Sequence, residues 1–220
     1  PIRKAKSATL PFPGWTDEDD WKGYVPFELM PQSLNPSEGF VATANNKIIA
    51  DSYPNYMSNL WAPDWRITRI TEALRSQGRF SVEDMQRLQQ DVVSPQAREL
   101  VPIILKAYDS LSARDADVQT TLAYFRNWNY EMKTNDVATT LFEAFLVQMV
   151  RNTFEDEMGP QLLAVYDTLA SVPLVAITKL MKKGSSAWFD DGRTPQVETI
   201  DDIIRRSVDD GLRELKTRFG

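Results

Sequence analysis

Hydrophobic positions from Trp61 onwards recur at the three- and four-residue spacing that is typical of amphipathic helices. Ile67, Ile70 and Leu74 form the first such series. Residues 81–84, Ser-Val-Glu-Asp, then carry a helix-capping signal ahead of a second apolar face, formed by Met85, Leu88, Val92 and Val93. The pattern therefore predicts successive helices with short breaks between them.

Later helix starts are marked by capping residues or by a proline in the first turn. Ser94 followed by Pro95 opens a helix whose inner side is expected to carry Ala97, Leu100, Val101, Ile104 and Leu105. Similar signals predict helices over residues 115–127, 134–154, 160–170 and 173–183, two of which are followed by Gly159 and Gly184. A last helix over residues 199–219 is predicted from one apolar stripe: Ile203, Ile204, Val208, Leu212, Leu215 and Phe219.

The first part of the chain has a different pattern. Residues 1–54 contain seven prolines, which exclude long helices and favour extended segments and turns. Residues 39–44 and 47–50 are predicted to form two short strands joined by a tight turn at Asn45 and Asn46, because asparagine tolerates the positive φ of such turns. The sequence thus predicts a mainly helical fold: a Pro-rich, β-containing arm over residues 1–60 and a helical domain over residues 61–220.

Composition excludes several kinds of chemistry. The 220 residues include no Cys and no His, which removes disulfides, thiolate sites and the commonest general base. The net charge of −6 argues against a nucleic-acid partner, and no apolar run is long enough to cross a membrane. A hydrolase of this composition needs a Ser/Lys pair, a carboxylate pair or an N-terminal amine that acts as its own base.

Two polar residues are candidates for catalysis, and each also has a structural interpretation. Asn45 is either a plain turn residue or a donor whose amide stabilises a developing oxyanion. Arg66 and Arg69 follow Trp61 and Trp65, so they are either surface cations over indole rings or include a guanidinium that orients a neighbouring group. Local sequence leaves both alternatives open.

Other conspicuous residues are better explained by structure. Asp190-Asp191, Asp201-Asp202 and Asp209-Asp210 are adjacent pairs, and neighbours on a helix point apart; the middle pair fits the first turn of a helix. Asp17-Glu-Asp-Asp20 lacks the spaced ligands and glycine of a calcium loop and indicates a solvated acidic turn. Four aromatic side chains at helical spacing are expected in the core: Trp128, Phe142, Phe145 and Phe154.

The order of the motifs resembles the penicillin amidase (penicillin acylase) family along nearly the whole chain. No single motif carries the resemblance, which rests on their unbroken order. The N-terminal motifs are Pro11-Phe-Pro-Gly-Trp15, Trp21-Lys-Gly-Tyr-Val-Pro-Phe27, Asn35-Pro-Ser-Glu-Gly-Phe40, Thr43-Ala-Asn-Asn46, Tyr53-Pro54 and Trp65-Arg-Ile-Thr-Arg-Ile70. The helical region adds Gln90-Asp-Val-Val-Ser94, Ala97-Arg98, Pro102 and Trp188-Phe-Asp-Asp191.

The resemblance implies an N-terminal-nucleophile hydrolase with a layered αββα core, which cleaves acyl amide bonds after its precursor is cut into two chains. In such enzymes the new N-terminal Ser attacks the amide with its own α-amine as base. The family's motif assigns Asn45 to the oxyanion hole, and it assigns Arg66 to orienting the asparagine and the nucleophile's amine. The implied partners are a small acyl amide substrate and the rest of the same precursor, namely the α chain and the remaining β chain.

The resemblance also sets expectations for what the chain lacks. Position 1 holds Pro1 rather than the serine nucleophile, so the chain is interpreted as an internal piece of the β chain that hydrolyses nothing unaided. Some members hold calcium with an Asp shortly after the Tyr-Pro motif, where this chain has Met57, Ser58 and Asn59, so no cofactor or metal is expected here. The parent protein is expected in the periplasm or outside the cell, and this chain shows no targeting segment. The first alternative function is a non-catalytic, acidic helical interaction module. The second is a calcium-dependent structural domain that uses Asp17, Glu18, Asp19 and Asp20.

Overall fold

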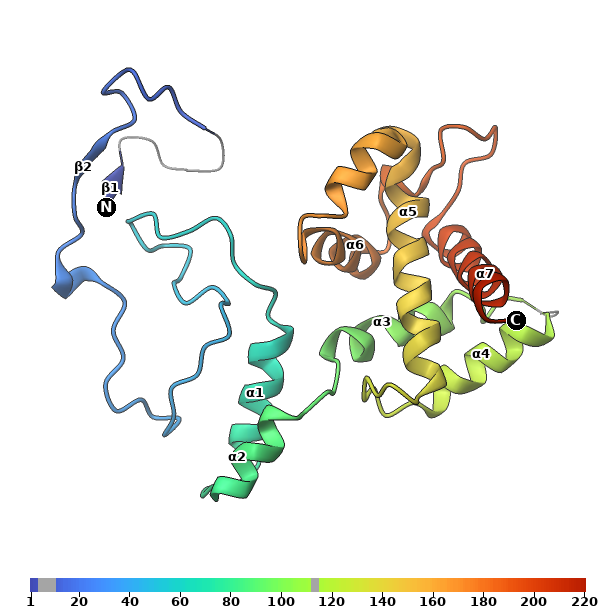
Figure 1. Ribbon diagram of the computed structural model, residues 1–220, viewed down its shortest axis with the longest axis horizontal. Coiled ribbons are helices and arrows are strands. Elements are labelled where there is room, and N and C mark those ends of the chain that lie inside the picture. The colour runs from blue at the N-terminus through green and yellow to red at the C-terminus, as the bar shows by residue number, and fades with distance from the viewer. Residues whose placement is uncertain (4–10, 112–114) are drawn as a thin grey trace. The chain divides into compact units, whose positions relative to one another are not determined.

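The computed structural model describes residues 1–3, 11–111 and 115–220, which form two compact units (Figure 1). Unit 1 comprises residues 1–80 and unit 2 comprises residues 81–220. The fold is mainly helical, as the sequence predicts. The contacts divide the chain after Phe80, whereas the composition changes near residue 61, so the first helix belongs to the N-terminal unit.

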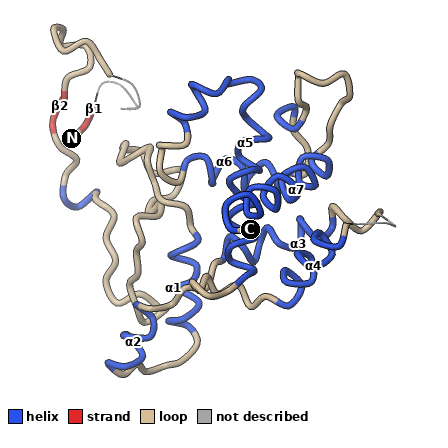
Figure 2. Tube along the Cα trace, turned by 45° about the vertical axis from the view of Figure 1, so that its right-hand side comes forward, coloured by secondary structure: helices blue, strands red, loops and turns tan. Residues whose placement is uncertain are grey.

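Unit 1 consists mostly of loops, which Figure 2 shows in tan. Its strands β1 (Ile2–Arg3) and β2 (Trp21–Gly23) pair in antiparallel fashion, and they are followed by the short 3-10 helix η1 (Phe27–Leu29) and by α1 (Trp65–Arg75). Prolines explain the scarcity of regular structure, since each removes a backbone donor and fixes φ. Side chains bridge the loops instead: the Tyr53 hydroxyl donates to the Leu29 carbonyl at 2.8 Å.

The predicted hairpin over residues 39–44 and 47–50 is wrong, because these residues contain no strand in the structure. Their backbone groups bond to other partners than a facing strand. The Ala44 N–H donates to the Asn46 side chain at 3.1 Å, and the Asn45 carbonyl accepts from the Ala62 N–H at 2.9 Å. An isolated pair of short strands is only marginally stable, and these local bonds replace its ladder. The expected positive φ at Asn45 is confirmed at 62°.

Unit 2 holds the remaining helices: α2 (Val82–Gln89), α3 (Pro95–Lys106), α4 (Ala116–Asn127), α5 (Val137–Tyr166), α6 (Val172–Lys183), the 3-10 helix η2 (Ala187–Phe189) and α7 (Ile200–Phe219). The predicted caps are confirmed where the sequence marks them most clearly. Ser81 forms a complete capping box with Asp84, and the Ser94 hydroxyl accepts from the Ala97 N–H. Gly184 ends α6 in the left-handed conformation, with φ 80°.

The predicted helices 134–154 and 160–170 form the single element α5, and the break between them is a kink. Gly159 interrupts the helical backbone with φ 71° and ψ 161°, and Pro160 follows in the first turn of the second half. The start lies later than predicted, at Val137, because the Asp136 carboxylate accepts from the Ala138 N–H and caps the helix there. The end lies earlier than residue 170, at Tyr166.

The core of unit 2 lies where α5 and α7 pack together, with α3, α4, α6 and η2 around them (Figure 1). The four aromatic residues predicted to be core are buried, and the Trp128 and Phe142 rings lie 5.6 Å apart. Gly211 of α7 lies so close to α5 that a Cβ there would sit 3.2 Å from the Ala144 carbonyl carbon. The α7 stripe is buried only in its first half, and Phe219 at its end is 80% exposed.

Of the helices described, none is long and apolar enough to span a bilayer.

Candidate active site

The candidate site lies within unit 1, at a bend of the loop that precedes α1. Asn45 occupies the bend in the left-handed conformation, which few residues other than glycine and asparagine tolerate. Its backbone carbonyl accepts from the Ala62 N–H at 2.9 Å, which ties the bend to the segment leading into α1. The preceding residue, Ala44, is buried, whereas the Asn45 side chain is exposed.

Arg66, in the first turn of α1, contacts this bend directly. Its Nη2 atom donates to the Asn45 Oδ1 atom at 2.9 Å and to the Ala44 carbonyl oxygen at 2.8 Å. One guanidinium nitrogen therefore holds both the side chain of Asn45 and the backbone next to it. The structure thus brings together the two residues that the sequence singled out, although they lie 21 positions apart.

This contact settles which way the Asn45 amide faces. A guanidinium carries only donors, so the atom that it bonds must be the carbonyl oxygen Oδ1. The Nδ2 amide group, with its two N–H bonds, consequently points away from Arg66. Within the described residues, nothing accepts a hydrogen bond from Nδ2. The arrangement offers a donor of fixed direction, which is what the stabilisation of a developing negative charge requires.

The second arginine of the motif has another role. Arg69 is half-buried, and its Nη1 atom lies 3.5 Å from a carboxylate oxygen of Glu72, one turn further along α1. The structure therefore distinguishes two cations that the sequence treats alike: Arg66 faces the bend, and Arg69 forms an ion pair on its own helix.

The acidic residues Asp17 to Asp20 form an exposed turn, in which the Asp20 N–H donates to the Asp17 carbonyl at 3.4 Å. In the described parts of the chain, no three carboxylates lie close enough together to hold a metal ion.

The adjacent aspartates of unit 2 differ from one another. Asp202 completes the cap of α7 by accepting from the Thr199 backbone N–H at 2.9 Å, as a first-turn acid should. Asp191 is 6% exposed and accepts from Arg193 and Arg206, each at 2.9 Å. No local pattern in the sequence predicts this arrangement. Hydrogen bonds from Arg193 are the main cause that lowers the pKa of Asp191 to about 2.

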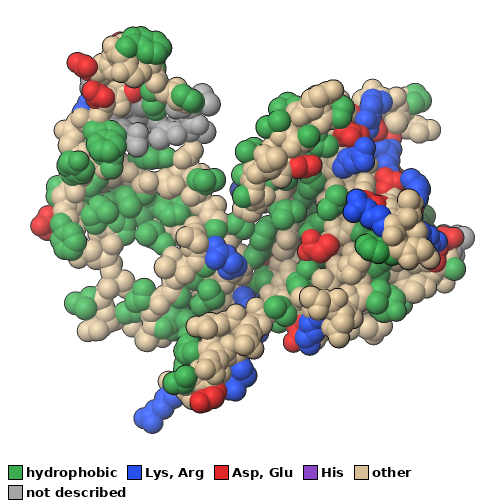
Figure 3. Space-filling view, in the orientation of Figure 1, with side chains coloured by type: hydrophobic (Ala, Val, Ile, Leu, Met, Phe, Trp, Pro, Cys, Tyr) green, Lys and Arg blue, Asp and Glu red, His purple; other side chains and the backbone are tan. Residues whose placement is uncertain are grey.

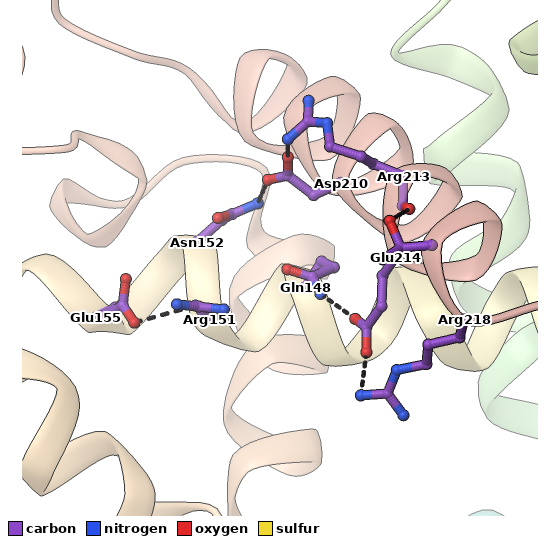
Figure 4. A pocket seen from close by; sticks show the side chains of 9 residues that line it. Gln148, Arg151, Asn152, Glu155, Asp210, Arg213, Glu214 and Arg218 are labelled. Carbon is purple, nitrogen blue, oxygen red and sulfur yellow. Dashed lines mark hydrogen bonds and ion pairs between the residues drawn. The ribbon is translucent and has the colours of Figure 1, made fainter.

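Unit 2 also has a polar groove between α5 and α7, shown in Figure 4. Its arginines are paired with carboxylates on their own helices: Arg151 with Glu155 at 3.0 Å, Arg213 with Asp210 at 2.8 Å, and Arg218 with Glu214 at 2.6 Å. Asn152 and Gln148 of α5 donate across the groove to Asp210 and Glu214. Because the charges balance within the groove, it joins the two helices and offers no unpaired charge to a ligand.

Comparison with known proteins agrees with the family named by the motifs. The model of the penicillin amidase family matches residues 1–220. Penicillin acylase 2 proenzyme of Pseudomonas sp. strain SE83 is 33% identical over 153 residues, which are 69% of this chain and 19% of that protein. An acyl-homoserine lactone acylase, QuiP of Pseudomonas aeruginosa, is 26% identical over 100% of this chain and 28% of its own length. Penicillin G acylase of Escherichia coli is 38% identical over 34% of this chain and 9% of its own. The chain therefore spans less than a third of each of these relatives.

Proposed function

The chain belongs to the penicillin amidase family, and we propose that in its parent protein it supplies part of the active site that hydrolyses an acyl amide bond. In this proposal Asn45 donates from Nδ2 to the oxyanion of the tetrahedral intermediate. The nucleophile is an N-terminal serine supplied from outside residues 1–220, with its own α-amine as the base. A chain with neither Cys nor His is compatible with that mechanism, because the mechanism needs neither.

The hydrogen bond from Arg66 to the Asn45 Oδ1 atom is the observation that carries the proposal. An oxyanion donor is effective when it points at the developing charge before the reaction starts, so that no reorganisation is needed in the transition state. A guanidinium suits this task because it stays protonated at any physiological pH and cannot turn into an acceptor. Arg66 thus orients the amide, and a cation beside the site also favours the anionic intermediate.

The substrate class follows from what the relatives are named for. The relatives' names point to penicillins and acyl-homoserine lactones, two classes of compound in which an acyl group is joined to nitrogen through an amide. In both classes the carbonyl oxygen of that acyl amide gains negative charge when the amide is attacked. We therefore assign the class as acyl amides and leave the acyl group to the part of the parent outside this chain.

The rest of the precursor is the partner that we propose for unit 1. Figure 3 shows apolar side chains over much of the visible surface of unit 1. Several large ones are mostly exposed: Trp15 at 86%, Phe27 at 76% and Leu60 at 76%. Surfaces of this kind are typical of segments that are buried against another part of an assembly. We propose that they join the layered αββα core in the parent, which would act in the periplasm or outside the cell.

Replacement of Asn45 by alanine in the parent protein tests the proposal. We expect Asn45→Ala to lower kcat roughly a hundredfold to a thousandfold on an N-phenylacetyl or N-acyl-homoserine lactone amide that the parent hydrolyses, since one preorganised donor is lost. Rates are compared per processed enzyme, after checking that the precursor is cut as in the wild type. The matched control is Asn55→Ala, because Asn55 is a half-buried asparagine of the same unit that makes no hydrogen bond to the described residues. An unchanged kcat in Asn45→Ala would remove this residue from the active site.

A further inference from the structure

The side chain of Asn46 spans the bend that holds Asn45. Its Oδ1 atom accepts from the Ala44 N–H at 3.1 Å, and its Nδ2 amide donates to the Lys47 carbonyl at 3.2 Å. The side chain is half-buried. A single amide group therefore bonds the backbone on both sides of Asn45.

Two further bonds act on the same short segment. The Ala44 carbonyl accepts from the Arg66 Nη2 atom at 2.8 Å, and the Asn45 carbonyl accepts from the Ala62 N–H at 2.9 Å. Consequently both backbone polar groups of Ala44 are held, one by Asn46 and one by Arg66. Ala44 is also 6% exposed, although the rest of the loop is largely open to solvent.

This bonding matters because the backbone at Asn45 is in an unfavourable region. Asparagine tolerates φ 62° better than most residues with a Cβ, but the left-handed region still costs energy, so the surrounding bonds help to hold the residue there. If the bend relaxed, the Cα–Cβ direction of Asn45 would turn, and its Nδ2 atom would move with it. A shift of about 1 Å in a catalytic group is enough to cost a large part of its effect on rate.

We propose that Asn46 is a positioning residue: it fixes the left-handed bend at Asn45 through its bonds to Ala44 and Lys47, and so sets the direction of the oxyanion donor. This inference rests on the proposed function of Asn45. In it, Arg66 fixes the oxygen end of the Asn45 amide, while Asn46 fixes the backbone from which that side chain extends. Asn46 itself touches no reacting atom.

The test uses the complete parent protein with two substitutions at this position. Asn46→Leu keeps the approximate size and removes both hydrogen bonds, whereas Asn46→Asp keeps an acceptor for the Ala44 N–H. We expect Asn46→Leu to lower kcat about tenfold with KM changed less than twofold, because the donor acts on the transition state. Asn46→Asp should recover part of that loss, and the control Asn55→Leu should leave kcat unchanged. A normal kcat in Asn46→Leu, or equal losses in Asn46→Leu and Asn46→Asp, would overturn the positioning role.

A double-mutant cycle separates action through Asn45 from a general loss of structure. When Asn45 is already alanine, Asn46→Leu should lower kcat no further, because the donor that it positions is gone. Additive losses would overturn the inference. The two proposals fail separately: a normal kcat in Asn45→Ala contradicts the proposed function, whereas an impaired Asn45→Ala beside a normal Asn46→Leu contradicts the positioning role alone.

Discussion

Units 1 and 2 differ in how many apolar side chains they bury. Unit 2 encloses a cluster of buried apolar side chains that runs from Ala97 to Val208. In the described part of unit 1, Ala44 is the one apolar residue that is buried, and α1 buries none of its side chains. Hydrophobic burial is the main favourable term in folding, so the two units differ in what holds them together. Unit 2 has a core of its own, whereas the described part of unit 1 is held mainly by hydrogen bonds.

The candidate site lies in the unit with the weaker core. Catalytic groups are often carried on loops that a scaffold positions, and the bend at Asn45 is such a loop. Within unit 1, the bend is held by Arg66 in the first turn of α1, by the amide of Asn46 and by the Ala62 N–H. Under the proposed function, the rest of the precursor would complete the support for this bend.

Separate expression of the two units tests this contrast most strongly. We expect residues 81–220 to keep a helical circular dichroism spectrum and to unfold in one cooperative transition, because the core cluster lies within them. We expect residues 1–80 to show no cooperative transition. A cooperative melt for the isolated N-terminal unit would contradict its dependence on other surfaces, and the intact 1–220 chain provides the reference.

Replacing one aromatic side chain in each unit by alanine measures the same contrast as a change in the free energy of unfolding. Phe142 of α5 has no exposed surface, whereas Trp15 of unit 1 is 86% exposed. Phe142→Ala should lower the free energy of unfolding of the 1–220 chain by about 3–5 kcal/mol. Trp15→Ala should change it by less than about 0.5 kcal/mol. Urea denaturation followed by circular dichroism measures both, and similar losses for the two variants would mean that unit 1 has a core of its own.

Substitution of Asp191 tests whether a buried charge stabilises unit 2. Removal of its charge breaks hydrogen bonds from two arginines, but Arg193 keeps Glu155 and Arg206 keeps Glu198 as partners, so Asp191→Asn should cost about 2 kcal/mol at pH 7. The folded-state pKa is lowered from 3.8 to about 2, so the stabilisation is complete above about pH 4 and is lost as pH falls through 2. Stability measured against pH should show the two proteins converging in acid. Asp201→Asn, a first-turn acid of α7, serves as the control and should change little.

The smallest effect on stability is expected for Glu157, and its dependence on pH is opposite to that of Asp191. Burial and the neighbouring Asp156 raise its pKa from 4.5 to about 7, so the folded state binds more protons than the unfolded state between these values. The contribution of Glu157 to stability is therefore lost as pH rises from about 5 to 7. Glu157→Gln should remove this dependence and stabilise unit 2 at pH 8 by less than about 1 kcal/mol, since Glu157 is exposed and solvent screens its charge. A gain that is the same at pH 5 and pH 8 would contradict the explanation.

Sequence signals predicted an element correctly where the bonds that form it lie within a few residues. The Ser81 capping box and the Ser94–Pro95 start depend on bonds within one helical turn, so their sequence suffices to locate them. The hairpin prediction was wrong because a strand needs hydrogen bonds to a neighbouring strand. In residues 39–50 the backbone instead bonds to side chains and to the Ala62 N–H. In the sequence Asp191 resembles half of an ordinary acidic pair, because one of its arginine partners, Arg206, lies 15 positions away.

The order of residue types alone was enough to establish the family, the helical character of the chain, most helix starts and the positive φ at Asn45, because each depends on neighbours within a few positions or on motif order. It was also enough to nominate Asn45 and Arg66. The tertiary structure was needed to show that the Arg66 guanidinium reaches the Asn45 oxygen, that Asn46 braces the bend, and that burial is confined almost entirely to one of two units. Those facts concern distances between residues far apart in the chain, which composition and periodicity do not specify.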